Sequence, residues 1–271
     1  MFDPLFNTLE QEAHVIRSAI GSGLTSLRKA NLNEKGAFYT GFFQLAIGFE
    51  RFAKLGLILD HMAHNQLAPP GAPAVKAMGH DIAALYALLE ATAGSRGYTL
   101  ASSFTPGSQG QRILDFLTQF AKGMRYANLD ALASGTLRPT PLSEWATILN
   151  EIMEVKVPAA KRNVIHSRAR ALGQAVGSTA LVIGSDLKGQ ALDFRSAFAT
   201  PEIYDLVSPH VIWEVLLLLS TVREFVVHTG DLAWQASAAS GGHKSLPYMP
   251  EFFDFMWSDR ETQMRKKRWP D

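Results

Sequence analysis

The chain of 271 residues contains no cysteine, which excludes disulfide bonds, thiolate metal sites and cysteine nucleophiles. Its net charge is nearly zero, since 26 Lys and Arg residues face 25 Asp and Glu residues, so no global preference for nucleic acid or membrane follows. The most apolar run, Val211–Val222, is short and contains Glu214, which predicts a buried helix and no membrane span. The first residues lack the basic segment of a signal peptide, so we expect a cytoplasmic protein.

Several sequence motifs of enzymes are also missing. Gly107-Ser-Gln-Gly110 lacks the lysine that a phosphate-binding P-loop needs, and neither a nucleophile elbow nor a paired-carboxylate motif is present. The sequence therefore predicts no cofactor, and any activity must depend on histidine, arginine or other side chains of the chain itself.

Apolar residues recur at helical spacing through most of the chain, which predicts an all-α protein built as an antiparallel helical bundle. Only residues 179–194 favour a small β-hairpin as strongly as a helix. Two prolines in Thr136–Pro141 indicate a boundary between residues 1–135 and a C-terminal helical part, residues 136–271, unless the two form one continuous domain. The predicted helices are residues 4–31, with Asp3 as the N-cap, 37–65, 80–91, 113–121, 125–133, 141–174 with an interruption at Pro158, and 201–229 with a possible break at Pro209.

The segment Ala37–Asn65 organises the chain, and one charge in it is unexpected. Glu50 falls close to one line with Lys54 and His61 along an otherwise apolar helix. A charge among large apolar neighbours is either paired or functional, because an unpaired one costs several kcal/mol. We expect a set of polar residues to form either a pocket for a nucleotide or phosphate or a buried ion-pair network. The set is Glu50, Arg51, His61, His80, Asp81, Arg125, Tyr126, Asn128 and Asp130.

Three blocks, IGFERFAKLGLILDHM, GHDIAAL and RYANLD, resemble in their order and separation the helical proteins of the HEPN superfamily. The resemblance covers residues 35–135 and is to uncharacterised bacterial members found near mobile or defence genes. It implies a helical bundle, frequent dimerisation and, in some relatives, metal-independent RNA cleavage by an arginine and a histidine a few residues apart. A homodimer, a role in a toxin or defence system and a cognate antitoxin-type protein partner are expectations of this resemblance.

The pair in this sequence with such spacing is Arg223 and His228. As catalytic residues, His228 would move a proton at the 2′-hydroxyl and Arg223 would stabilise the anionic phosphorane. Glu224 follows the arginine where ribonuclease relatives tend to carry a small polar residue. The alternative is structural: a histidine at a helix end beside a core arginine whose hydrogen bonds are satisfied.

His61 and His64 share a helical face at a spacing that metal sites use. The glutamate that accompanies histidine at this spacing in helical-bundle metal sites is missing, so no metal is predicted. Histidines in the last turn of a helix also interact favourably with its dipole.

The stretch from Val155 to Ser185 contains no acidic residue. Arg162, His166 and Arg170 recur every fourth residue and make one row, opposite an apolar row. This pattern is typical either of a helix on a phosphate backbone or of a solvated surface. The predicted phosphate-binding residues are Lys161, Arg162, His166, Arg168 and Arg170. The sequence thus supports two functions: a HEPN-like protein that binds or cleaves RNA or a nucleotide, and a non-catalytic dimerisation or assembly module.

Overall fold

The computed structural model describes residues 4–101, 105–136, 138–176, 182–239 and 246–270, and 77% of them are helical. The all-α prediction is confirmed. Within these ranges no strand forms, and the expected hairpin is reduced to one isolated antiparallel bridge between Ser185 and Ala191. Its turn is closed by Asp186, whose carboxylate accepts hydrogen bonds from the backbone N–H groups of Lys188 and Gln190, both at 2.8 Å. Residues 179–181 of the expected hairpin and the expected N-cap Asp3 lie outside the described ranges.

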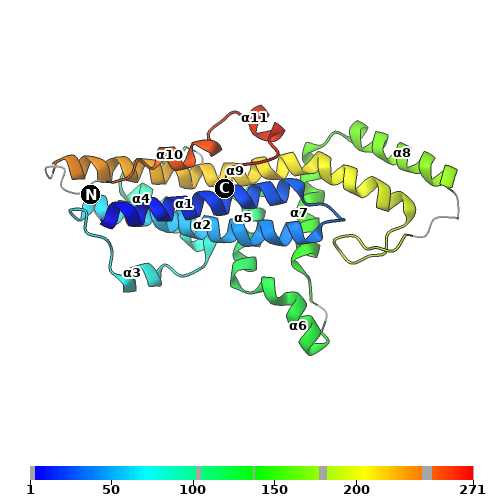
Figure 1. The fold of residues 1–271 in the computed structure, drawn as a ribbon, viewed down its shortest axis with the longest axis horizontal. Coiled ribbons are helices and arrows are strands. Elements are labelled where there is room, and N and C mark those ends of the chain that lie inside the picture. The colour runs from blue at the N-terminus through cyan, green and yellow to red at the C-terminus, as the bar shows by residue number, and fades with distance from the viewer. Residues whose placement is uncertain (1–3, 102–104, 137, 177–181, 240–245, 271) are drawn as a thin grey trace.

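Three long helices run along the long axis of the molecule (Figure 1): α1 (Pro4–Lys29), α2 (Lys35–His64) and α9 (Phe194–Ala239). The helices α1 and α2 approach closely because glycines face side chains across their interface. A Cβ atom added to Gly48 would lie 2.8 Å from Ile20, and one added to Gly23 would lie 2.8 Å from Leu45. Glycine thus costs helix propensity here but allows close backbone packing.

Shorter helices surround this central group (Figure 1), with α8 at one end of the molecule and α6 projecting from its side. They are α3 (Ala72–Ala77), α4 (Ile82–Ser95), α5 (Gln109–Lys122), α6 (Ala127–Ser134), α7 (Pro141–Lys156), α8 (Ala159–Val176), α10 (Pro250–Phe253) and α11 (Arg260–Arg265), with 3-10 turns at Met124–Tyr126 and Asp254–Met256.

The helix expected over 201–229 differs most from the structure. It begins at Phe194, ends at Ala239 and continues through both Pro201 and Pro209, so the possible break at Pro209 is wrong. A proline removes one backbone hydrogen bond and bends a helix, and α9 is visibly curved in its first third (Figure 1). Burial of residues on both sides of Pro209, including Val207 and Val211, maintains the helix across the bend.

The hydrophobic core is continuous across both parts of the chain. An aromatic group joins Phe42 of α2 to Phe116 and Phe120 of α5 and to Trp145 of α7, with ring centroids 4.7 to 5.5 Å from Phe42. Apolar residues of α9 belong to the same core. One core thus contains residues from both sides of residue 136. The division into two parts stays a prediction.

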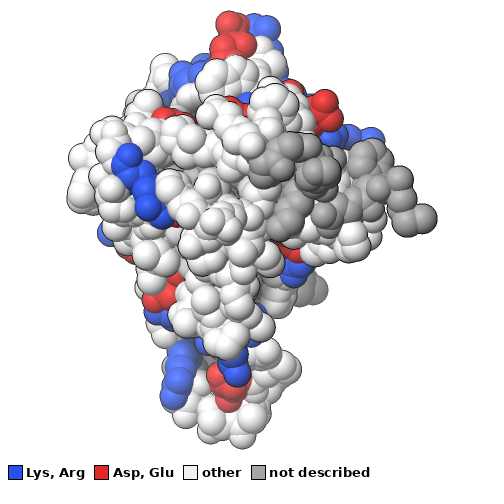
Figure 2. All heavy atoms as spheres, turned by 90° about the vertical axis from the view of Figure 1, so that its left-hand side faces the viewer, with Lys and Arg blue, Asp and Glu red and all other residues white. Residues whose placement is uncertain are grey.

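The two ends of the molecule differ in charge. Figure 2 views the end opposite α8 and shows few Lys, Arg, Asp or Glu side chains over its centre. The sequence agrees, because residues 61–75 and 232–239 contain none of these four types. None of the described helices combines the length and the apolar run that crossing a bilayer requires.

Candidate functional site

The helix α8 is formed by a local break and packs through a narrow stripe. Val157 adopts an extended conformation (φ −103°, ψ 117°) before Pro158, which ends α7 and allows α8 to start in a new direction. Of the 18 residues of α8, only Ile165 and Ala169 are buried. The other residues of the helix are exposed or partly exposed, and most of its basic side chains face solvent.

The structure places four of the five predicted phosphate-binding residues in exposed positions: Lys161, His166, Arg168 and Arg170. The fifth, Arg162, is 18% exposed and pairs with Glu154 of α7. Arg168 pairs with Glu202 of α9. Among the described residues no ion pair or side-chain hydrogen bond is present for Lys161, His166 or Arg170, so these three are available to a ligand.

A histidine of α9 lies near basic residues of α7, α8 and α11. Burial lowers the pKa of His210 on α9, and the charges of Arg260, Lys156 and Lys161 lower it further. Lys156 itself lies 3.4 Å from the carboxylate of Glu214, which is only 9% exposed. The basic region therefore involves α7, α8 and α11 together, although part of it is neutralised internally.

The structure does not bring Arg223 and His228 together, although both lie on α9. The Arg223 guanidinium donates to the Phe253 carbonyl (3.2 Å), pairs with Asp254 (3.3 Å) and lies 4.6 Å above the Trp257 ring. The imidazole of His228 instead stacks on Tyr98, with ring centroids 4.0 Å apart. A separation of five residues places side chains about 140° apart around a helix, which accounts for their different neighbours.

The predicted polar set separates into small independent contacts. Glu50 accepts hydrogen bonds from Lys54 (2.8 Å) and from Nδ1 of His80 (2.9 Å). Among the described residues, no other side-chain hydrogen bond or ion pair joins two members of the set. Glu50 also lines a hollow of about 430 Å³ whose walls are mostly apolar, including Ile58 and Val75.

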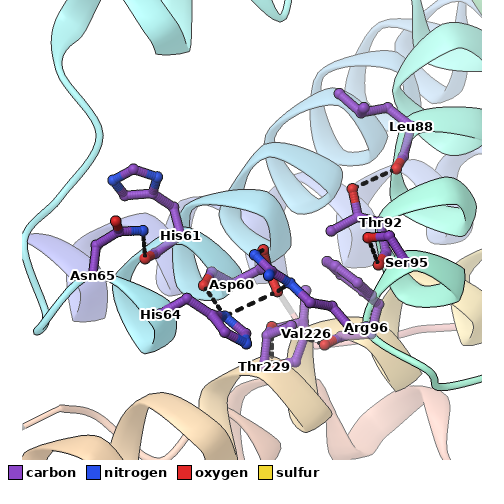
Figure 3. Close-up of polar contacts among 11 residues, drawn as sticks. Asp60, His61, His64, Asn65, Leu88, Thr92, Ser95, Arg96, Val226 and Thr229 are labelled. Atoms are coloured by element: carbon purple, nitrogen blue, oxygen red, sulfur yellow. Dashed lines mark hydrogen bonds and ion pairs between the residues drawn. The ribbon is translucent and has the colours of Figure 1, made fainter.

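The other members of the set have separate partners. Arg51 pairs with Glu12 at 2.6 Å, and Asp81 caps α4 and pairs with Lys122, which holds the pKa of Asp81 below its usual value. Asn128 donates to Tyr39 (2.8 Å), and Arg125 lies over the Tyr126 ring. Asp130 is exposed, and among the described residues its carboxylate has no ion pair or hydrogen bond; its backbone carbonyl accepts one from Ser134. His61 points away from its neighbour Asp60 (Figure 3).

A network around the buried Asp60, at the end of α2, was missed by the sequence analysis (Figure 3). Asp60 is 6% exposed and accepts two hydrogen bonds from the Arg96 guanidinium, at 3.2 and 3.0 Å. His64 lies 3.4 Å from the same carboxylate and 2.8 Å from the Asp60 carbonyl. The sequence signal that could have found this network is a charged residue in an apolar helix, the same signal that singled out Glu50. Asp60 is the more buried of the two.

This arrangement gives His64 a structural role at the helix end. Among the described residues no group of three or more histidine, aspartate and glutamate side chains is placed to hold a metal ion.

Comparisons of the chain with protein-family models, with curated proteins and with solved structures found no match. The HEPN-like resemblance, the homodimer and the antitoxin-type partner therefore stay predictions. The surface of α8 carries exposed basic side chains, Lys161, His166 and Arg170, that are available to a ligand.

Proposed function

We propose that the protein binds RNA through α8, with Lys161, His166 and Arg170 contacting the phosphate backbone. The observation that supports this most is that an 18-residue helix without an acidic residue buries only two side chains. Exposed cations without an internal partner give up no ion pair of the folded protein when they bind phosphates. Their binding also releases the counterions condensed on the nucleic acid.

The distribution of charge over the molecule supports the same surface. The chain as a whole carries a net charge of only +1, so binding to a polyanion requires a local concentration of positive charge. Exposed cations without an internal partner gather on α8, whereas few charged side chains lie over the centre of the opposite end (Figure 2). We therefore expect α8 to be a surface on which a polyanion meets unpaired cations.

The geometry gives more support to binding than to cleavage. Arg223 is 11% exposed and is held by three partners, and His228 stacks on a tyrosine on another side of α9. Cleavage requires both groups within reach of one phosphate. For a ribonuclease activity, the side chain of Arg223 or His228 would have to leave its present neighbours and reach the other. We therefore propose binding rather than cleavage.

The test is fluorescence anisotropy with a labelled single-stranded RNA of mixed sequence at low salt. Lys161→Ala/Arg170→Ala removes two exposed cations of α8, and we expect it to weaken binding at least tenfold for all sequences alike. The matched control is Lys29→Ala/Lys76→Ala, which removes two exposed cations outside α8 and should change binding less than twofold. Equal losses of RNA affinity in both variants would mean that only the net charge of the protein matters, which would contradict a site on α8. Absence of RNA binding by the wild type would refute the proposal.

A further inference from the structure

A groove of about 460 Å³ lies between α8 and α9, beside the proposed phosphate-binding residues. Its floor is apolar and is formed by Val164, Ile165 and Leu206. Val164 is 58% exposed, so a large apolar side chain of the groove remains open to solvent. The volume is within the range of about 300–1,000 Å³ that small-molecule sites occupy.

Charged residues of opposite sign line the two walls of the groove. On the α8 wall Lys161 and Arg168 are cationic, and on the α9 wall Glu202 and Asp205 are anionic. Arg168 and Glu202 pair with each other. Among the described residues neither Lys161 nor Asp205 has an ion pair or a side-chain hydrogen bond. Burial lowers the pKa of Arg28, and the charge of Asp205 opposes that shift without a direct contact.

The groove therefore presents one unpaired cation and one unpaired carboxylate on opposite sides of an apolar floor. A ligand that matches it has a flat apolar body, a hydrogen-bond-donating edge and a negative charge nearby. A nucleotide in a single strand has these three features, since the base supplies the body and the edge and the adjoining phosphate supplies the charge.

We propose that this groove binds one unpaired guanine base of a single-stranded RNA, with its Watson–Crick edge on Asp205 and the adjoining phosphate on Lys161. The inference depends on the proposed RNA binding by α8 and adds a substrate class to it. A carboxylate only accepts hydrogen bonds, through two oxygens. Guanine offers two adjacent donors, N1–H and the N2 amino group, and thus matches both oxygens.

The other bases match this carboxylate less well. Adenine and cytosine each offer one amino group beside an acceptor nitrogen, and uracil offers one N–H between two carbonyl oxygens that the carboxylate repels. In a duplex the same edge of guanine is already paired, so the groove selects single strands. Discrimination by a two-bond contact of this kind corresponds to about tenfold or more in affinity.

The experiment compares three labelled heptamers that differ only at the central base: guanine, hypoxanthine or uracil in a run of uridines. Hypoxanthine lacks the N2 amino group and keeps N1–H. By anisotropy at low salt we expect the guanine heptamer to bind about tenfold more tightly than the uracil heptamer, with hypoxanthine between them.

Two variants assign the preference to the groove. Asp205→Ala should give the three heptamers equal affinity while binding of the uracil heptamer is unchanged or strengthened, because a negative charge is lost. Asp130→Ala, which removes an exposed carboxylate on α6, should retain the preference. Equal binding of the three heptamers by the wild type, or a preference that persists in Asp205→Ala, would overturn this inference and leave RNA binding intact. Absence of binding to every heptamer would refute the proposed function itself.

Discussion

The helices α2 and α8 differ in the fraction of their residues that is buried in the core. α2 buries 15 of its 30 residues and contacts the core on several sides, whereas α8 buries 2 of 18. Substitutions in α2 are therefore constrained by packing, and the charges that it carries near the core are paired. In α8 the fold requires only a narrow apolar stripe, so the remaining residues are free to serve another purpose.

The charges on the two helices follow the same difference. Asp60 on α2 is buried and is held by Arg96, because an unpaired charge there would be costly. Lys161 and Arg170 on α8 are exposed and need no partner for stability. A paired buried charge is a feature of the fold, whereas a group of unpaired exposed charges of one sign indicates a partner outside the molecule.

The largest expected effect is a difference in the free energy of unfolding between a substitution in α2 and one in α8. Phe49 of α2 is 1% exposed, and Phe49→Ala should lower the free energy of unfolding by about 3–5 kcal/mol. Val164 of α8 is 58% exposed, and Val164→Ala should change it by less than about 0.5 kcal/mol. Urea denaturation followed by circular dichroism measures both. Similar losses in the two variants would mean that α8 is as much part of the core as α2.

A smaller difference in the free energy of unfolding should distinguish the removal of two charges on α2. Asp60→Ala should cost about 2–3 kcal/mol, less than a fully buried pair because Arg96 is 40% exposed. Glu50 is 20% exposed and faces a hollow, so Glu50→Ala should cost about 1 kcal/mol. The same urea denaturation series measures both variants. A greater loss for Glu50→Ala would place the essential ion pair in the middle of α2 and not at its C-terminal end.

The smallest effect concerns His210 and the pH dependence of stability. Its pKa is lowered in the folded protein by burial and by nearby cations, so the unfolded chain binds a proton more readily. Stability is therefore complete above the ordinary histidine value of about 6.5 and decreases as the pH falls from there toward the lowered pKa. The melting temperature should fall less between pH 7.5 and pH 5 in His210→Gln than in the wild type. An identical decrease in both proteins would contradict this assignment.

Most of the fold was predictable because periodicity records which face of a helix is buried. The expected ranges 4–31 and 37–65 became α1 and α2, and the interruption at Pro158 separates α7 from α8. The extent of α9 was not predictable from local signals. Pro209 favours a break locally, but burial of both flanking turns outweighs the lost hydrogen bond, and burial depends on tertiary packing.

The site was predictable in composition but not in its pairing. The absence of acids on α8 was visible in the sequence, whereas Glu154 and Glu202, which neutralise Arg162 and Arg168, come from other helices. The groove and the unpaired Asp205 required the packing of α9 beside α8. A one-dimensional pattern gives the face of a helix, but it does not give the charges that neighbouring helices place against that face.

The central claim is that α8 is a phosphate-binding surface and that the fold does not require its basic residues. The salt dependence of RNA binding tests this claim most directly. The logarithm of the association constant for single-stranded RNA should fall linearly with the logarithm of salt concentration. In Lys161→Ala/Arg170→Ala the slope should flatten by about one to two units, with the free energy of unfolding unchanged within about 0.5 kcal/mol. An unaltered slope in this folded variant would contradict the account.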